Sequence, residues 1–125
     1  PLDRLADTLV TPVRVMPESF HEGTVPACQG HLSGLEDLED VALVALKPWE
    51  DGADATIVRL ANNADAAREV RLALDFLGGR TLETTLGAFQ VRTFLVPADA
   101  GEDIREVDLL EFPPDKALPY LSERV

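Results

Sequence analysis

The sequence predicts an all-β fold, built as an antiparallel two-sheet β-sandwich. Seven or eight short segments are rich in β-branched residues or alternate between apolar and polar residues, and turn-forming residues separate them at fairly even intervals. Little of the chain has the three- and four-residue apolar spacing of the helices that a parallel α/β sheet needs between successive strands. The 125 residues, 46% of them hydrophobic, suffice for one core, so a single domain is expected.

We expect residues 1–16 to form a linker or a lead-in strand. Leucine and alanine residues near the start are spaced as in a short amphipathic helix, and a linker remnant is the alternative. Thr11–Met16 carries Val13 and Val15 on one side, and Pro12 and Pro17 bound the strand, which is typical of a sheet edge. The chain begins at Pro1 without an initiator methionine, and we expect it to be a fragment of a longer polypeptide.

The sandwich domain is assigned to residues 17–112, and residues 113–125 are assigned to a C-terminal tail. The domain starts with a stretch from Glu18 to Glu39 in which glycine and proline recur, so we expect loops there around one strand near Gln29–Leu35. Two consecutive prolines after Phe112 end the regular structure.

The centre of the predicted core is a hairpin. Its strands are Val41–Leu46 and Ala55–Ala61, and the polar stretch Glu50–Asp54 supplies the glycine and aspartate residues that favour a turn. The first strand has no polar residue before Lys47, which predicts that both of its faces are covered.

Four further strands follow the hairpin. In the first of them, Val70, Leu72 and Leu74 alternate with Arg71, which places the aliphatic side chains inward and the arginine outward. The paired glycines after Leu77 predict a tight turn. The four strands are expected at Arg68–Phe76, Thr81–Leu86, Phe89–Val96 and Ile104–Phe112.

Composition limits the classes of partner. The net charge of −12, from 23 acidic against 11 basic residues, argues against binding to a nucleic-acid backbone. The longest apolar run is too short to span a bilayer, so no membrane partner is expected. The single cysteine, Cys28, has no partner for an internal disulfide, and no apolar signal segment stands at the start; together these favour a cytoplasmic protein.

The sequence provides no specific catalytic or metal-binding motif. His21, His31 and Cys28 match no zinc-binding spacing, so neither a metal site nor a cofactor is expected in this chain. None of the serines stands in a G-x-S-x-G elbow, and Cys28 is better explained as a small buried residue than as a nucleophile. Paired carboxylates are not excluded, because any two of the 23 acids can meet in a fold.

Three residues are candidates for contact with a sugar or for the rim of a sugar cleft: Trp49, Arg59 and Asn62. Trp49 lies beside a turn and is either a rim residue packed on Pro48 or an exposed platform for a sugar ring. Arg59 interrupts an apolar strand, which a partner acid across the sheet, a domain interface or a ligand would each explain.

The segment Val41–Asn62 resembles part of the C-terminal β-sandwich region of bacterial family 38 glycoside hydrolases, the α-mannosidases. The likeness extends over residues 20 to 112. The stretches that carry it are Leu46-Lys47, Glu50-Asp51-Gly52, Ile57-Val58-Arg59-Leu60 with Asn62, His21-Glu22-Gly23-Thr24-Val25-Pro26, Leu86 to Phe94, and Val107-Asp108-Leu109-Leu110-Glu111, where Asp108 replaces the asparagine of the family.

This resemblance implies a supporting role. The zinc ligands and the catalytic aspartate of that family lie in an upstream domain, so no catalytic residue is carried over and zinc is expected only in the parent's catalytic domain. The parent would be a zinc-dependent α-mannosidase acting on mannose-containing glycans, and the isolated fragment would be inactive. Its partner would be the upstream catalytic domain of the same chain. The alternative is an independent carbohydrate-binding module.

Overall fold

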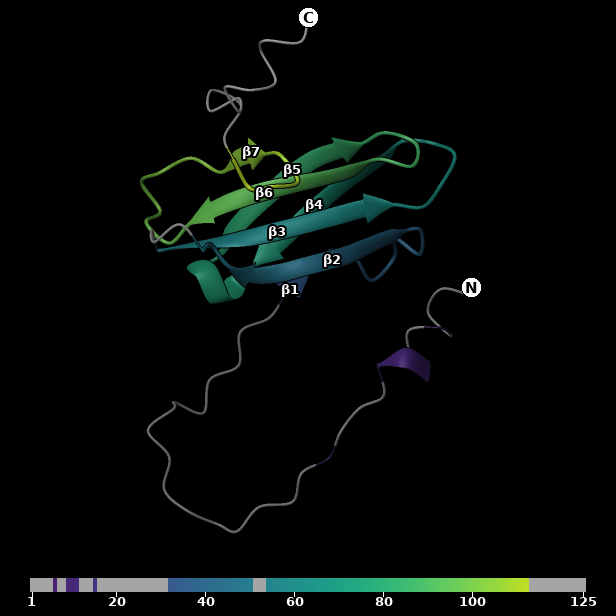
Figure 1. The fold of residues 1–125 in the computed structure, drawn as a ribbon, viewed down its shortest axis with the longest axis horizontal. Helices are drawn as coiled ribbons and strands as arrows, with labels where there is room; N and C mark the ends of the chain where they lie inside the picture. The colour runs from purple at the N-terminus through teal and green to yellow at the C-terminus, as the bar shows by residue number, and fades with distance from the viewer. Residues whose placement is uncertain (1–5, 7–8, 12–14, 16–31, 51–53, 113–125) are drawn as a thin grey trace, which may run out of the picture.

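A computed structural model describes residues 6, 9–11, 15, 32–50 and 54–112. The strands form two antiparallel sheets packed face to face (Figure 1). The three-stranded sheet has the order β1-β4-β5, with β1 at Leu32–Ser33, β4 at Arg68–Leu74 and β5 at Arg80–Leu86. The four-stranded sheet has the order β2-β3-β6-β7, with β2 at Val41–Pro48, β3 at Ala55–Asn62, β6 at Val91–Pro97 and β7 at Arg105–Val107. The predicted antiparallel β-sandwich is confirmed.

The central hairpin is confirmed, but the prediction that both faces of its first strand are covered is wrong. Strands β2 and β3 pair antiparallel from Val41 opposite Asn62 to Pro48 opposite Thr56. Among the described strands β2 pairs only with β3, so it is an edge strand. Val44 and Leu46 are 55% and 44% exposed, and the register shifts next to Val44. An apolar run does not distinguish a central strand from an edge strand, because that depends on which strands lie beside it.

The main core lies between the two sheets. In β4, Val70, Leu72 and Leu74 are buried and Arg71 is exposed, as the alternation predicted. The strands on both sides supply the other buried members of this cluster, which are Val41, Val58, Leu60, Leu82, Leu86, Phe94 and Val96.

A second, smaller cluster lies on the outer face of the four-stranded sheet. Because side chains alternate along a strand, Val58 and Leu60 point into the sandwich whereas Ile57 points outward. Ile57 is nevertheless fully buried, since it packs with Ala55, Leu95 and Val107, and Trp49 lies against this cluster. The outer face is therefore partly covered by the chain itself.

The strand predicted at Phe89–Val96 begins only at Val91, because Phe89 lies in the preceding turn with a φ of 52°. Three other predicted strands are shorter in the structure. The described part of the first, near Gln29–Leu35, is the two-residue β1. The strand predicted to reach Phe76 ends at Leu74, and a 3₁₀ turn, η1 (Asp75–Leu77), leads to two glycines with φ of 70° and 74°. The strand predicted at Ile104–Phe112 is β7 alone, and the chain then turns at 109–110.

Several predicted features lie partly or wholly outside the described residues. Ala6, Leu9 and Val10 are helical, in line with the spacing of apolar residues there. The predicted edge strand at 11–16 is described only at its first residue, in a bend, and at Val15. His21, Cys28 and His31 lie outside the described ranges. No helix within the described ranges is long and apolar enough to cross a membrane.

Candidate functional site

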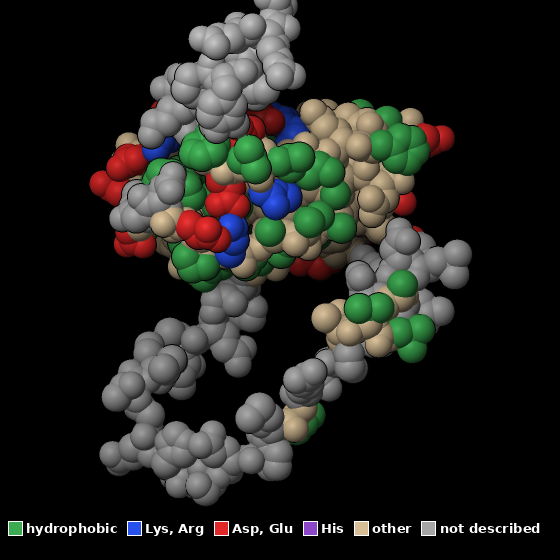
Figure 2. Space-filling view, in the orientation of Figure 1, with side chains coloured by type: hydrophobic (Ala, Val, Ile, Leu, Met, Phe, Trp, Pro, Cys, Tyr) green, Lys and Arg blue, Asp and Glu red, His purple; other side chains and the backbone are tan. Residues whose placement is uncertain are grey.

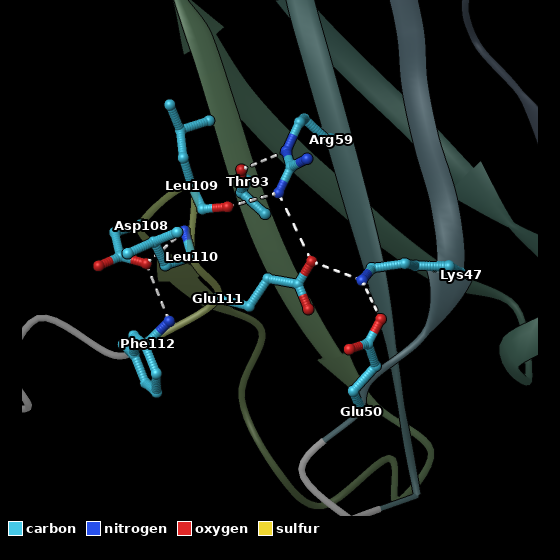
Figure 3. A network of polar contacts seen from close by, with 9 residues as sticks. All are labelled: Lys47, Glu50, Arg59, Thr93, Asp108, Leu109, Leu110, Glu111 and Phe112. Atoms are coloured by element: carbon cyan, nitrogen blue, oxygen red, sulfur yellow. Dashed lines mark hydrogen bonds and ion pairs between the residues drawn. The ribbon is translucent and has the colours of Figure 1, made fainter.

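The outer face of the four-stranded sheet carries a network of charged side chains centred on Arg59 of β3 (Figure 3). The Arg59 Nε–H donates to Thr93 Oγ1 of β6 at 3.0 Å, and Nη2 donates to the carbonyl oxygen of Leu109 at 3.0 Å. Nη2 also lies 3.6 Å from Glu111 Oε1. The Arg59 side chain is only 20% exposed, so these partners compensate a guanidinium that is largely withdrawn from water.

Lys47 of β2 extends the network across the sheet. Its Nζ lies 2.9 Å from Glu111 Oε1 and 2.8 Å from Glu50 Oε1. The hydrogen bond to Glu50, followed by the one to Glu111, raises the pKa of Lys47 above its usual value. The hydrogen bond from Lys47 in turn lowers the pKa of Glu50. The Glu111 carboxylate, 13% exposed, therefore bridges two cations from adjacent strands.

The segment after β7, residues 108–112, brings Glu111 over the sheet. Oδ1 of Asp108 accepts hydrogen bonds from the backbone N–H of Leu110 at 2.8 Å and of Phe112 at 2.9 Å. Glu111 has a φ of 69°, a backbone conformation that non-glycine residues rarely adopt. The Asp108 turn and the two ion pairs hold this residue in place.

Apolar side chains surround the charged network. Val91, Leu109 and Leu110, which we call the apolar rim, are 45%, 63% and 64% exposed. They line a groove of about 450 Å³ between the start of β6 and the segment after β7. Figure 2 shows acidic and basic side chains near the middle of this face with hydrophobic side chains around them. Contiguous exposed apolar side chains mark surfaces that contact other proteins.

Trp49 lies toward another end of the same outer face. It is half-buried and packs against the cluster of Ile57, Leu95 and Val107. It also lines a second hollow of about 210 Å³, together with Asp54, Asp99, Glu102 and Arg105, among others. Trp49 thus has a packing contact on the sheet and is also part of the wall of a small pocket. Sugar stacking on Trp49 stays a prediction.

Asn62 lies inside the fold. It is 2% exposed, and its Nδ2 donates to the carbonyl oxygens of Ala66 at 2.8 Å and Gly87 at 2.8 Å, with a longer contact to Leu86 at 3.4 Å. Its Oδ1 accepts from the N–H of Ala64 at 2.9 Å. The amide therefore ties the end of β3 to the end of β5, and this placement withdraws it from the surface on which Trp49 and Arg59 lie.

The structure brings Trp49 and Arg59 onto one face but not Asn62. For Arg59 the partner acid is Glu111, which lies in the segment after β7 and not in a neighbouring strand. The apolar rim was missed because Leu109 and Leu110 stand in a stretch that the sequence predicts as a strand. The signal for a turn was Asp108, whose side chain caps the following amides.

No group of three or more histidine, cysteine, aspartate or glutamate side chains that could hold a metal ion is present in the described part of the chain. Comparison with protein-family models, curated proteins and solved structures finds no match for this chain.

Proposed function

We propose that this chain is a non-catalytic β-sandwich domain of an α-mannosidase-like glycoside hydrolase, and that it supports the catalytic domain upstream in the same polypeptide. The observation that carries the proposal is the apolar rim of Val91, Leu109 and Leu110 beside the Arg59 network. The resemblance of residues 20–112 to the C-terminal sandwich of family 38 enzymes names the partner. Mannose-containing glycans would then contact this domain only when it is part of the parent enzyme.

The physical basis of the support is burial of the rim. Leu109 and Leu110 are both exposed by more than three fifths, and covering aliphatic side chains contributes about 25 cal/mol per Å² of apolar area. The charged centre has its partners inside the domain, since Glu111 pairs with Lys47 and Arg59. Docking over this face would therefore bury the side chains of Leu109 and Leu110. Lys47 and Arg59 would keep their partner within the domain, so no described cation of the network would be left unpaired.

The first test is the sequence of the source gene upstream of Pro1. A long upstream region with the zinc-ligand and aspartate motifs of family 38 is the expected result. A gene without such a region would overturn the proposal.

The second test measures the docking itself. With the upstream region and this chain produced as separate polypeptides, we expect association in calorimetry, and Leu109→Asp should weaken it by at least tenfold because an apolar contact becomes a buried charge. Val44→Asp is the matched control: Val44 is 55% exposed on β2, the strand at the opposite edge from β7. If both variants lost the same binding affinity, or if Leu109→Asp lost none, docking through the apolar rim would be contradicted.

A further inference from the structure

A small pocket lies where β3 begins and β6 ends, on the outer face of the four-stranded sheet. Its volume is about 210 Å³. Trp49 and Leu95 give it apolar walls, and Asp54, Asp99 and Glu102 bring carboxylates to it. It shares no lining residue with the groove of the apolar rim.

The walls of the pocket are held in place by contacts from both sheets. Arg80 of β5 donates from Nη1 to the carbonyl oxygens of Pro97 at 2.6 Å and Asp99 at 3.1 Å, and from Nη2 to that of Glu102. The N–H of Ala98 donates to the carbonyl oxygen of Asp54 at 2.8 Å, which joins the two acidic sides. The loop that carries Asp99 and Glu102 is therefore fixed before any ligand arrives.

The charge of the pocket selects the sign of its ligand. Three acidic residues line the pocket, and two guanidinium groups lie near it. Arg105 lies 3.7 Å from Glu102 in an exposed pair, and Arg80 donates only to backbone carbonyl oxygens, so the carboxylates outnumber the cations by one. Asp99 Oδ1 accepts the N–H of Gly101 at 2.8 Å, which leaves its other oxygen without a contact to a described residue. Within the described residues Asp54 has no ion-pair partner. The local field thus repels anions and attracts cations.

We propose that the Trp49 pocket binds an organic cation, namely an ammonium group on a short apolar stem. The stem packs on Trp49 and Leu95, and the ammonium group lies near the carboxylates of Asp54 and Asp99. Indole is the side chain whose π-face attracts cations most strongly, and an apolar wall with a few convergent polar groups is the usual make-up of a small-molecule site. A free amine and a lysine side chain of a partner share this chemistry. The inference goes beyond the docking role and does not depend on it.

The test uses the single tryptophan as a reporter. Trp49 is the only tryptophan of the chain, so one indole N–H resonance and the intrinsic fluorescence both report on the pocket. In a titration of the whole chain with n-butylammonium we expect a saturable shift, and none with n-butanol, which has the same stem without the charge. Binding should weaken as salt rises, because exposed charges are screened.

Two conservative variants locate the charge. Asp54→Asn and Asp99→Asn should each weaken n-butylammonium binding about two- to fivefold, as for an exposed ion pair. Asparagine at 99 keeps an oxygen that can accept the N–H of Gly101, so the loop should persist. Glu69→Gln is the matched control, because it removes one charge from an exposed position in β4 and should leave binding unchanged.

The outcomes separate the alternatives. Tighter binding of Nα-acetyl-lysine amide, whose side-chain ammonium group is free, than of n-butylammonium supports the proposal and assigns the cation to a polypeptide. The reverse order supports it and assigns a free amine. The proposal would be overturned if n-butylammonium gave no saturable shift or if n-butanol gave an equal shift. It would also be overturned if Glu69→Gln weakened binding of n-butylammonium as much as Asp54→Asn and Asp99→Asn do. A shift with methyl α-mannopyranoside but not with the amine would also overturn it, in favour of the carbohydrate-binding module. None of these results affects docking through the apolar rim.

Discussion

At the scale of single residues, the pair of Arg92 and Glu106 shows how one contact sets a pH dependence. Arg92 Nε donates to Glu106 Oε1 at 2.8 Å and Nη2 donates to Oε2 at 2.5 Å, a two-bond contact between β6 and β7. Arg92 also donates to Thr84 of β5, so it links the two sheets, and its guanidinium lies 5.2 Å from the centre of the Phe94 ring. The hydrogen bonds from Arg92 lower the pKa of Glu106 below its usual value of 4.5.

A lowered pKa in the folded state means that the stabilisation is present above the carboxyl pKa of the unfolded chain. It is lost as the pH falls through the lower pKa of the folded state. Glu106→Gln should therefore be less stable than the parent at pH 7 by less than about 1 kcal/mol, since the Glu106 side chain is 46% exposed. Urea unfolding at neutral and acidic pH checks this: the difference should shrink in acid, and a constant difference would contradict it.

At the scale of elements, Asn62 joins the ends of two strands from different sheets. Its side chain makes hydrogen bonds to the backbone of the 64–66 turn and of the 86–87 turn after β5. Asn62→Ala should lower the free energy of unfolding by about 2–3 kcal/mol, because buried backbone groups lose their partners. Asn63→Ala, at the exposed neighbour, should change it by less than about 0.5 kcal/mol. Equal effects of the two substitutions in thermal unfolding would refute the connecting role of Asn62.

At the scale of the whole molecule, one core between the sheets accounts for most of the burial. Leu72 is fully buried there, whereas Leu110 on the outer face is 64% exposed. Leu72→Ala should cost about 2–5 kcal/mol of unfolding free energy, because it leaves a cavity between the sheets. Leu110→Ala should cost less than about 0.5 kcal/mol in the isolated chain. Urea unfolding compares them directly, and a large loss in Leu110→Ala would show that the apolar rim supports this domain itself.

The fold class, the central hairpin and the inward face of β4 can be predicted from the amino-acid sequence. These depend on local patterns, since alternation and turn residues act over a few positions. The position of β2 at the edge of its sheet becomes visible only in the folded chain, because sheet order depends on residues far apart in the sequence. The same is true of the need for glycine at position 34, where a Cβ would lie 2.0 Å from the carbonyl oxygen of Arg71. The same holds for Arg59 and Glu111, which are brought together by a turn where the sequence predicts a strand, so their pairing could not be read from spacing.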